Sequence, residues 1–228
     1  MESAPSFDAL APRGRPGRRH EPTSRDLGKE RTRQALIEAA LRMFAEDGYD
    51  GTTAEAIAAR AGVTSRTLFR HFPTKESILF SGEDRFYRSF IDAYGGQARA
   101  DGDLPAILRA FVSVAPVLEG LRDWHRLYRQ ATASSSTLRG QEQRHLDGHV
   151  ASLAEAIAGR RGAGRADTSC RVLATVSVAT VEMAITDWAT GRWPGRLPRV
   201  IEDRFALLAG ISDAGRATGS TESRFVSP

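Results

Sequence analysis

A polar and basic segment over 64–75 has the residue types and spacing needed to bind DNA. The outward positions of a helix expected over 65–72 carry hydroxyls, basic groups and one aromatic ring: Ser65, Arg66, Thr67, Phe69, Arg70 and His71. Because a guanidinium can donate two hydrogen bonds to O6 and N7 of guanine, Arg66 is the candidate base reader. Lys75, in the first turn of the next helix, can reach a phosphate that the helix N-terminus already attracts.

Two short helices must position these groups, and the sequence supplies the features that define them. Each helix is preceded by a threonine that can accept hydrogen bonds from first-turn N–H groups, and we include both threonines, Thr53 and Thr64, among the DNA-binding candidates. Between the helices, Gly62 can adopt a left-handed conformation without steric strain. Ala58 permits close helix crossing, while Leu68 and Phe72 fall on the inner side. The pattern predicts a helix-turn-helix, with an ordinary helical hairpin as the alternative.

The rest of the chain also has a helical pattern, which predicts an all-α protein of nine helices. Long stretches lack proline, and no stretch alternates as a strand would. The expected helices span 26–47, 54–61, 65–72, 74–94, 104–115, 116–133, 137–159, 167–190 and 198–211, with breaks at Pro105 and Pro116. We assign 1–25 to a disordered arm, 26–75 to an N-terminal three-helix helix-turn-helix DNA-binding domain, 76–213 to a C-terminal helical bundle for ligand binding and dimerisation, and 214–228 to a flexible tail.

The composition excludes several classes of protein. The 228 residues are 41% hydrophobic with a net charge of +4, as in an ordinary soluble protein. No apolar run approaches the ~18 residues of a membrane span and no secretory signal is evident, so we expect a cytoplasmic protein without membrane contact. The single cysteine, Cys170, excludes an internal disulfide and a cysteine-rich metal site.

The N-terminal arm contains Arg13-Gly14-Arg15-Pro16. This segment resembles the core of an AT-hook, in which arginines lie in a narrow, electronegative minor groove. On that interpretation Arg13 and Arg15 bind DNA. The alternative is a solvated basic tail, which would still add salt-sensitive affinity.

A longer segment carries a specific family resemblance. The run AALRMFAEDGYDGTTAEAIAARAGVTSRTLFRHFPTKESIL combines Phe-Ala-x-x-Gly-Tyr, a Thr-Thr pair, an Ala-Gly-Val turn and Phe-Pro-x-Lys-Glu. It resembles the DNA-binding domain of the TetR family of bacterial transcription regulators, over about 50 residues. The resemblance implies an all-helical homodimer with one DNA-binding domain per subunit and a C-terminal domain that binds a small ligand.

The resemblance also implies roles for individual residues. Ser65, Arg66 and Thr67 occupy base-reading positions, and Thr53 and Lys75 occupy phosphate-contacting positions. At two further positions, Phe69 and His71, family members usually touch the backbone or a thymine methyl. The family most often has Tyr in place of Phe69, and a phenyl ring cannot donate to a phosphate, so apolar contact is the expected role here.

The C-terminal region faintly resembles the acyl-CoA-like ligand-binding domain of some TetR regulators. Aromatic side chains and a nearby arginine are the candidates for an effector pocket: Phe90, Phe111, Trp124, Tyr128, Arg129 and Trp188. Aromatic residues at helical spacing are also typical of a plain core, which is the alternative.

Dimerisation is expected through the last two long helices. The segment 172–188 is nearly uncharged and apolar on more than one face, so it needs cover from its own domain and from a partner. We place Ala184 at this seam. The family resemblance puts a four-helix dimer interface in the same region.

No cofactor, metal site or catalytic set is predicted. His145 and His149 have the i, i+4 spacing of metal ligands, but no third ligand is evident nearby in the sequence. The sequence therefore favours a ligand-responsive repressor that binds a palindromic operator as a homodimer. An architectural DNA-binding protein without an effector is the main alternative, and an enzyme using His125, His145 or His149 is another.

Overall fold

The computed structural model describes residues 23–98 and 100–219, without the side chains of residues 83 and 212–219. These residues form nine α-helices and no strand: α1 (Ser24–Glu46), α2 (Ala54–Arg60), α3 (Ser65–His71), α4 (Lys75–Gly95), α5 (Asp103–Glu119), α6 (Arg122–Ser134), α7 (Ser136–Arg161), α8 (Thr168–Ala189) and α9 (Leu197–Gly219). The all-α prediction is confirmed. Arg13, Arg15 and residues 220–228 lie outside the described residues.

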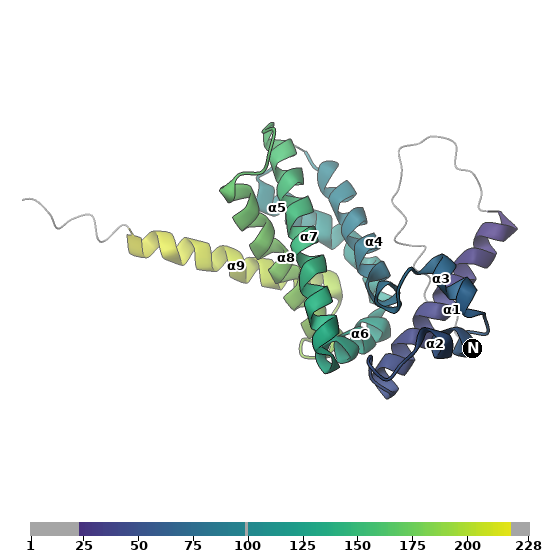
Figure 1. Cartoon of the computed structure of the whole chain (residues 1–228). Coiled ribbons are helices and arrows are strands. Elements are labelled where there is room, and N and C mark those ends of the chain that lie inside the picture. Colours follow the sequence, from purple (N-terminus) through teal and green to yellow (C-terminus); the bar gives the residue numbers. More distant parts are fainter. Residues whose placement is uncertain (1–22, 99, 220–228) are drawn as a thin grey trace, which may run out of the picture.

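The helices form an N-terminal unit and a larger bundle. In Figure 1, α1 to α3 lie together at one end, while α4, α5, α7 and α8 run beside one another in the bundle. Helix α6 lies between this bundle and α1, and α9 runs past α5 and α8 and continues beyond them. Helix α4 contacts α1 on one side and α5 and α7 on the other, so it links the two parts.

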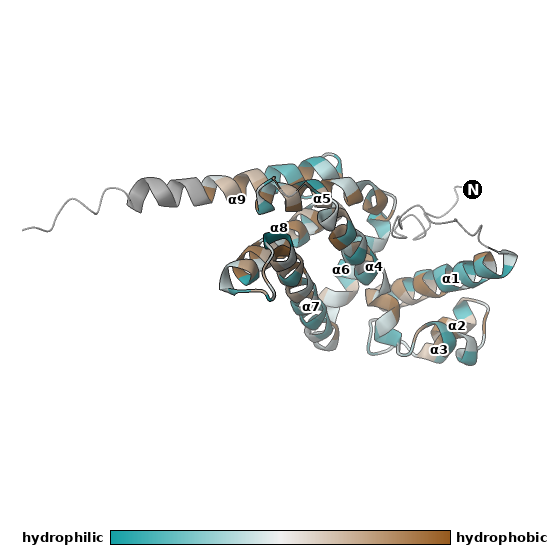
Figure 2. Cartoon of the chain, turned by 90° about the horizontal axis from the view of Figure 1, so that it is seen from above, coloured by the Kyte–Doolittle hydropathy of each residue, from teal (hydrophilic) through white to brown (hydrophobic). Residues whose placement is uncertain are grey.

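The distribution of apolar residues explains how α1 packs. A capping box at Thr23 and Asp26 starts the helix, and its first turns are exposed. Its buried residues fall between Leu36 and Phe44, at the end near α4 and α6, where Figure 2 shows brown, apolar residues. Burial of this half anchors the N-terminal unit to the bundle.

The predicted break at Pro116 is wrong, because α5 continues through this residue to Glu119. Proline removes one backbone hydrogen bond, and in the last turn of a helix little structure remains to be disrupted. The chain turns instead at Gly120 and Leu121, and α5 and α6 meet there at 95°. The predicted end of the last helix at 211 is also too early, since α9 runs to Gly219.

Helix α8 is long and apolar enough to meet the length and composition criteria for a membrane span, contrary to our expectation from the sequence. Less than half of its apolar window, 44%, is buried within the protomer. The buried side packs on α7 and α9, as in the core helix of a folded bundle. Its other side carries exposed apolar residues that are described below.

Candidate DNA-binding surface and core of the C-terminal bundle

The predicted helix-turn-helix geometry is present between α2 and α3. Gly62 has φ of 71°, in the left-handed region, and the N–H of Val63 donates to the carbonyl of Ala58 at 2.9 Å. Ala58 is 1% exposed, and Leu68 of α3 is fully buried. The small side chain thus lets the two helices approach, and Leu68 fixes the rotation of α3.

Fixing Leu68 inward turns a basic and apolar face of α3 to solvent. Arg66, Phe69 and Arg70 are exposed, while Ser65 and Thr67 are half-buried. No ion pair to Arg66 or Arg70 is found within the described part of the chain. The two guanidinium groups are therefore available for phosphates or base edges, and the 47% exposed ring of Phe69 lies on the same short helix.

The two predicted threonines cap their helices. Thr53 accepts a hydrogen bond from the N–H of Ala56 at 3.1 Å, and Thr64 accepts one from the N–H of Thr67 at 3.3 Å. Both side chains are exposed. A cap of this kind is worth ~1 kcal/mol, so both residues have a structural task in addition to any contact with DNA.

Lys75 is held inside the N-terminal unit rather than directed outward. Its ammonium donates to the carbonyls of Tyr49 and Thr52 at 2.8 and 2.9 Å and lies 3.9 Å from the centre of the Tyr49 ring. These contacts join the start of α4 to the loop after α1. The geometry does not support the phosphate contact that we expected, because the charge is already bound to two backbone acceptors.

His71 also differs from its five outward neighbours. Like Ser65 and Thr67 it is half-buried, but its Nε2 atom is buried without a hydrogen-bond partner among the described residues. Burial lowers the pKa of His71, and the nearby Arg70 adds to this effect. The side chain is therefore directed toward the protein interior, which argues against the predicted contact with the DNA backbone.

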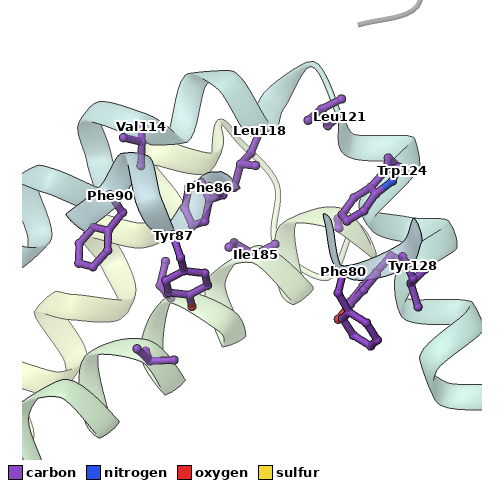
Figure 3. Packing of buried hydrophobic residues seen from close by; sticks show 14 of the residues in the cluster. Phe80, Phe86, Tyr87, Phe90, Val114, Leu118, Leu121, Trp124, Tyr128 and Ile185 are labelled. Atoms are coloured by element: carbon purple, nitrogen blue, oxygen red, sulfur yellow. The ribbon is translucent and has the colours of Figure 1, made fainter. Parts of the chain in front are cut away.

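The five aromatic candidates for the effector pocket are buried and Arg129 is partly buried, but the six residues do not line one cavity. Phe90 and Phe111 stack with centroids 3.6 Å apart and planes 3° apart, while Trp124 and Tyr128 form a second stack at 5.2 Å. Trp188 packs beneath the guanidinium of Arg122, 5.2 Å from the ring centre. Figure 3 shows several of these rings filling the space between helices. The protomer therefore supports the alternative, in which the aromatic residues form a plain core.

Arg129 lies between two carboxylates rather than facing an empty pocket. It pairs with Glu142 of α7 at 2.6 Å and with Glu182 of α8, and the exposed fractions of the three side chains are 19%, 15% and 13%. The hydroxyls of Tyr87 and Tyr128 donate to Glu182 and Glu142 at 3.0 and 3.2 Å.

The space beside this cluster is a cavity of about 10 Å³, which Trp124 and Arg129 line together. It holds no more than about one water molecule. Burial raises the pKa of Glu142. With one arginine and two glutamates, the cluster has no spare positive charge, so the predicted anion-binding role of Arg129 is not supported.

Four large apolar side chains of α8 and α9 are exposed, and together they are called the exposed stripe. Val172 and Met183 of α8 are 57% and 56% exposed, and Leu207 and Ile211 of α9 are 60% and 72% exposed. Ala184, which we placed at this seam, is fully buried within the protomer, so that prediction is wrong. Adjacent residues of a helix point about 100° apart, so Ala184 lies on the inner face of α8 while Met183 lies on the outer face.

The two histidines of α7 have an acidic neighbour that the sequence does not place near them. Asp84 of α4, 61 residues earlier, has Oδ1 at 3.3 Å from Nδ1 of His145 and 4.0 Å from Nε2 of His149. His149 stacks on the Tyr87 ring, with centroids 3.8 Å apart. Burial lowers the pKa of His149 to about 4. A third potential ligand is therefore close to the two histidines in space, although it lies far from them in the sequence.

Two family models match the chain. The model described as bacterial regulatory proteins of the tetR family covers residues 36–81, and the model described as the MftR C-terminal domain covers residues 103–212. The first includes the helix-turn-helix, and the second includes α5 to α8 and most of α9.

Curated relatives match less than half of the chain. The transcriptional regulator TcmR of Streptomyces glaucescens is 36% identical over 93 residues, which is 41% of each chain. The transcriptional repressor KstR2 of Rhodococcus jostii is 37% identical over 98 residues, 41% of this chain and 46% of that protein. The matched region thus spans less than half the length of these relatives.

Solved structures extend the likeness to about three quarters of the chain. The fatty acid degradation regulator FadR of Bacillus halodurans has a TM-score of 0.54 at 23% identity, covering 78% of this chain and 95% of that one. FadR of Bacillus subtilis, solved in complex with stearoyl-CoA, has a TM-score of 0.51 at 22% identity, with 77% and 96% covered. At these identities the likeness establishes the fold alone.

Proposed function

The chain belongs to the TetR family of bacterial transcription regulators, and from this premise we propose that it is a repressor that binds a palindromic operator as a homodimer and is released by a small-molecule effector. The observation that carries the proposal is the outward face of α3. Leu68 fixes the helix, and Arg66, Phe69 and Arg70 remain exposed beside it. A helix held this way fits the recognition helix of a helix-turn-helix.

A homodimer would give the two recognition helices a fixed separation. The exposed stripe of Val172, Met183, Leu207 and Ile211 is the surface that we assign to the contact, because these large apolar side chains have no cover within the protomer. A two-fold dimer contacts two half-sites about one DNA turn, ~34 Å, apart, so the operator is expected to be palindromic. Because DNA is its partner, we place the protein in the cytoplasm.

Release by an effector is the second half of the proposal. A Bacillus subtilis protein of this fold was solved with stearoyl-CoA, and the fold therefore accommodates a small molecule in that case. In the present chain, the stacked rings of Phe90 and Phe111 would have to separate to admit one. The effector would then stabilise a bundle conformation in which the recognition helices no longer match the operator.

The alternative of an architectural DNA-binding protein predicts a different response to sequence. Footprinting upstream of its own gene, followed by binding to that duplex and to a scrambled duplex, distinguishes the two. We expect Arg66→Ala to weaken operator binding by roughly 1 to 3 kcal/mol and to relax base preference at one position in each half-site.

The matched control is Arg165→Ala, which removes an exposed arginine from the loop between α7 and α8. It should leave both affinities close to those of the wild type. Equal loss on the operator and the scrambled duplex in Arg66→Ala would contradict base reading. The absence of any preferred duplex for the wild-type chain would favour the architectural alternative.

A further inference from the structure

The cluster of Asp84, His145 and His149 lies where α4 and α7 pack together. The three ligand atoms are within 4.8 Å of one another, and they come from two helices that are separated in sequence. The cluster opens onto a cleft of about 490 Å³ that is also lined by Tyr87 and Ser152. It is distinct from the exposed face of α3 that carries Arg66 and Arg70, and Tyr87 lies between it and the cluster around Arg129, stacking on His149 and donating to Glu182.

The ligand types and spacing match those of a zinc-class ion. Imidazole nitrogen and carboxylate oxygen are common zinc ligands, and the His-x-x-x-His spacing places both rings on one face of α7. A tetrahedral ion with ligands at 2.0–2.1 Å requires ligand atoms about 3.3 Å apart. The distance from Asp84 to His145 is already 3.3 Å, and the distance from Asp84 to His149 is 4.0 Å.

The two rings are held in place before any ion is bound. His145 stacks on Phe80 of α4 with centroids 4.4 Å apart, and His149 stacks on Tyr87, also of α4, at 3.8 Å. Asp84 is 39% exposed, so it can adjust toward both nitrogens. Only small movements of side chains are needed to complete the triangle.

A hydrogen bond between His145 and Asp84 does not account for the whole cluster. The Nε2 atom of His149 is buried without a hydrogen-bond partner among the described residues, although its side chain is 11% exposed. A buried nitrogen without a partner destabilises the folded state. An ion between the three groups would satisfy the nitrogen and the carboxylate together.

The charged residues around the cleft do not prevent a cation from binding. Arg88 and Arg144 also line it, but both side chains are exposed, and Asp92 contributes an opposite charge. Exposed charges are screened by water and salt, whereas the three ligand groups lie closer to the protein interior.

We propose that Asp84, His145 and His149 bind one divalent transition-metal ion of the zinc class, with a fourth position left for water or an exogenous ligand. The ion links α4 to α7. Since α4 begins directly after the helix-turn-helix, the link constrains how the N-terminal unit is held on the bundle. Metal occupancy thus becomes an input to the regulator that is separate from the effector.

The test measures metal binding by the full chain in the absence of DNA, so its result does not depend on the regulator proposal. Co²⁺ serves as the spectroscopic probe, Zn²⁺ as the competitor in calorimetry, and Mg²⁺ as a cation that prefers oxygen ligands. We expect one Zn²⁺ per protomer, a higher melting temperature with Zn²⁺ than without it, and no effect of Mg²⁺.

Two variants and a matched control identify the ligands. Asp84→Asn and His145→Gln should each weaken Zn²⁺ binding roughly 100-fold or more, because even outer-shell partners contribute 10- to 100-fold. Asp92→Asn removes the same charge from the same cleft without touching the three ligand groups, and should bind as the wild type does. Far-ultraviolet circular dichroism confirms that the variants are folded.

Three results would overturn the proposal. The first is a wild-type chain that binds no Zn²⁺, and the second is an Asp84→Asn or His145→Gln chain that binds Zn²⁺ as tightly as the wild type. The third is stabilisation by inorganic phosphate but not by Zn²⁺, which would identify the cleft as an anion site built on Arg88 and Arg144.

Discussion

The N-terminal unit and the C-terminal bundle use their polar residues in opposite ways. On α3, Arg66 and Arg70 are exposed and unpaired within the described residues. In the bundle, Arg129 is enclosed by Glu142 and Glu182. One region presents charge to a partner, and the other neutralises charge within its core. An arginine in the sequence is therefore a binding candidate only once its carboxylate neighbours are known.

The largest effect is expected at the exposed stripe of the bundle. Met183→Arg places a charge at 56% exposed Met183 and should give monomers. Loss of the linked second half-site would weaken operator binding on the order of 100-fold or more. Sedimentation measures the oligomeric state, and operator titration measures the affinity. The control is Ala151→Arg, at an exposed position of α7. A dimeric Met183→Arg chain with unchanged affinity would move the interface elsewhere.

The second prediction concerns the enclosed arginine. Arg129→Met leaves two carboxylates facing each other without a cation, so we expect the free energy of unfolding to fall by about 3 to 5 kcal/mol. Urea unfolding at pH 7 measures it. The control is Arg126→Met on the same helix, whose side chain is 55% exposed and pairs at 3.5 Å with a solvated Asp123. Similar losses of unfolding free energy in the two variants would contradict the view that the enclosed arginine contributes more to stability than an exposed one.

Lys75 tests whether the N-terminal unit presents all of its basic groups to DNA. Lys75→Met removes the hydrogen bonds to the carbonyls of Tyr49 and Thr52, so the free energy of unfolding should fall by about 2 to 3 kcal/mol. The salt dependence of DNA binding should stay unchanged, because the ammonium does not contact a phosphate. Lys29→Met, at a 61% exposed position, is the control for charge alone. A salt slope lower by about one per subunit, with stability intact, would restore the phosphate contact.

The smallest effect comes from a buried histidine of the bundle. Burial lowers the pKa of His125 to about 3, against about 6.5 in an unfolded chain. Because the unfolded state takes up the proton first, stability is retained above pH 6.5 and lost as the pH falls toward 3. Between pH 7 and 5.5 the loss from this group is about 1 kcal/mol. His125→Leu should remove that loss from the change in unfolding free energy between pH 7 and 5.5, and an equal change in the variant and the wild type would contradict the assignment.

The sequence predicts features that depend on neighbouring residues. The turn at Gly62, the caps at Thr53 and Thr64 and the inward position of Leu68 are all local, and the structure contains them. Ala184 shows that the rotation of a helix about its axis is harder to predict than its position in the sequence. The helix was placed correctly, but its neighbour Met183 is the exposed side chain, because a helix that is apolar on several faces gives no clear rotation.

Features that depend on distant residues were not accessible in this way. Asp84 approaches His145 from 61 positions earlier, and Arg129 meets Glu182 from 53 positions earlier. Neither pairing follows from helical periodicity, since it requires the register of one helix against another. Tyr49 and Lys75 both belong to the family pattern, but they are 26 positions apart and their spacing does not indicate a contact.

The stacked rings of Phe90 and Phe111 have a consequence for the timing of a response. A molecule that enters between them binds a conformation that is rare in the closed protomer. If opening requires about 2.7 kcal/mol, the open form is about 1% populated and the apparent affinity is about 100-fold weaker than the intrinsic one. The observed binding rate then levels off at the opening rate as the concentration of the molecule rises. Separation of the two rings would therefore limit how fast the protein responds.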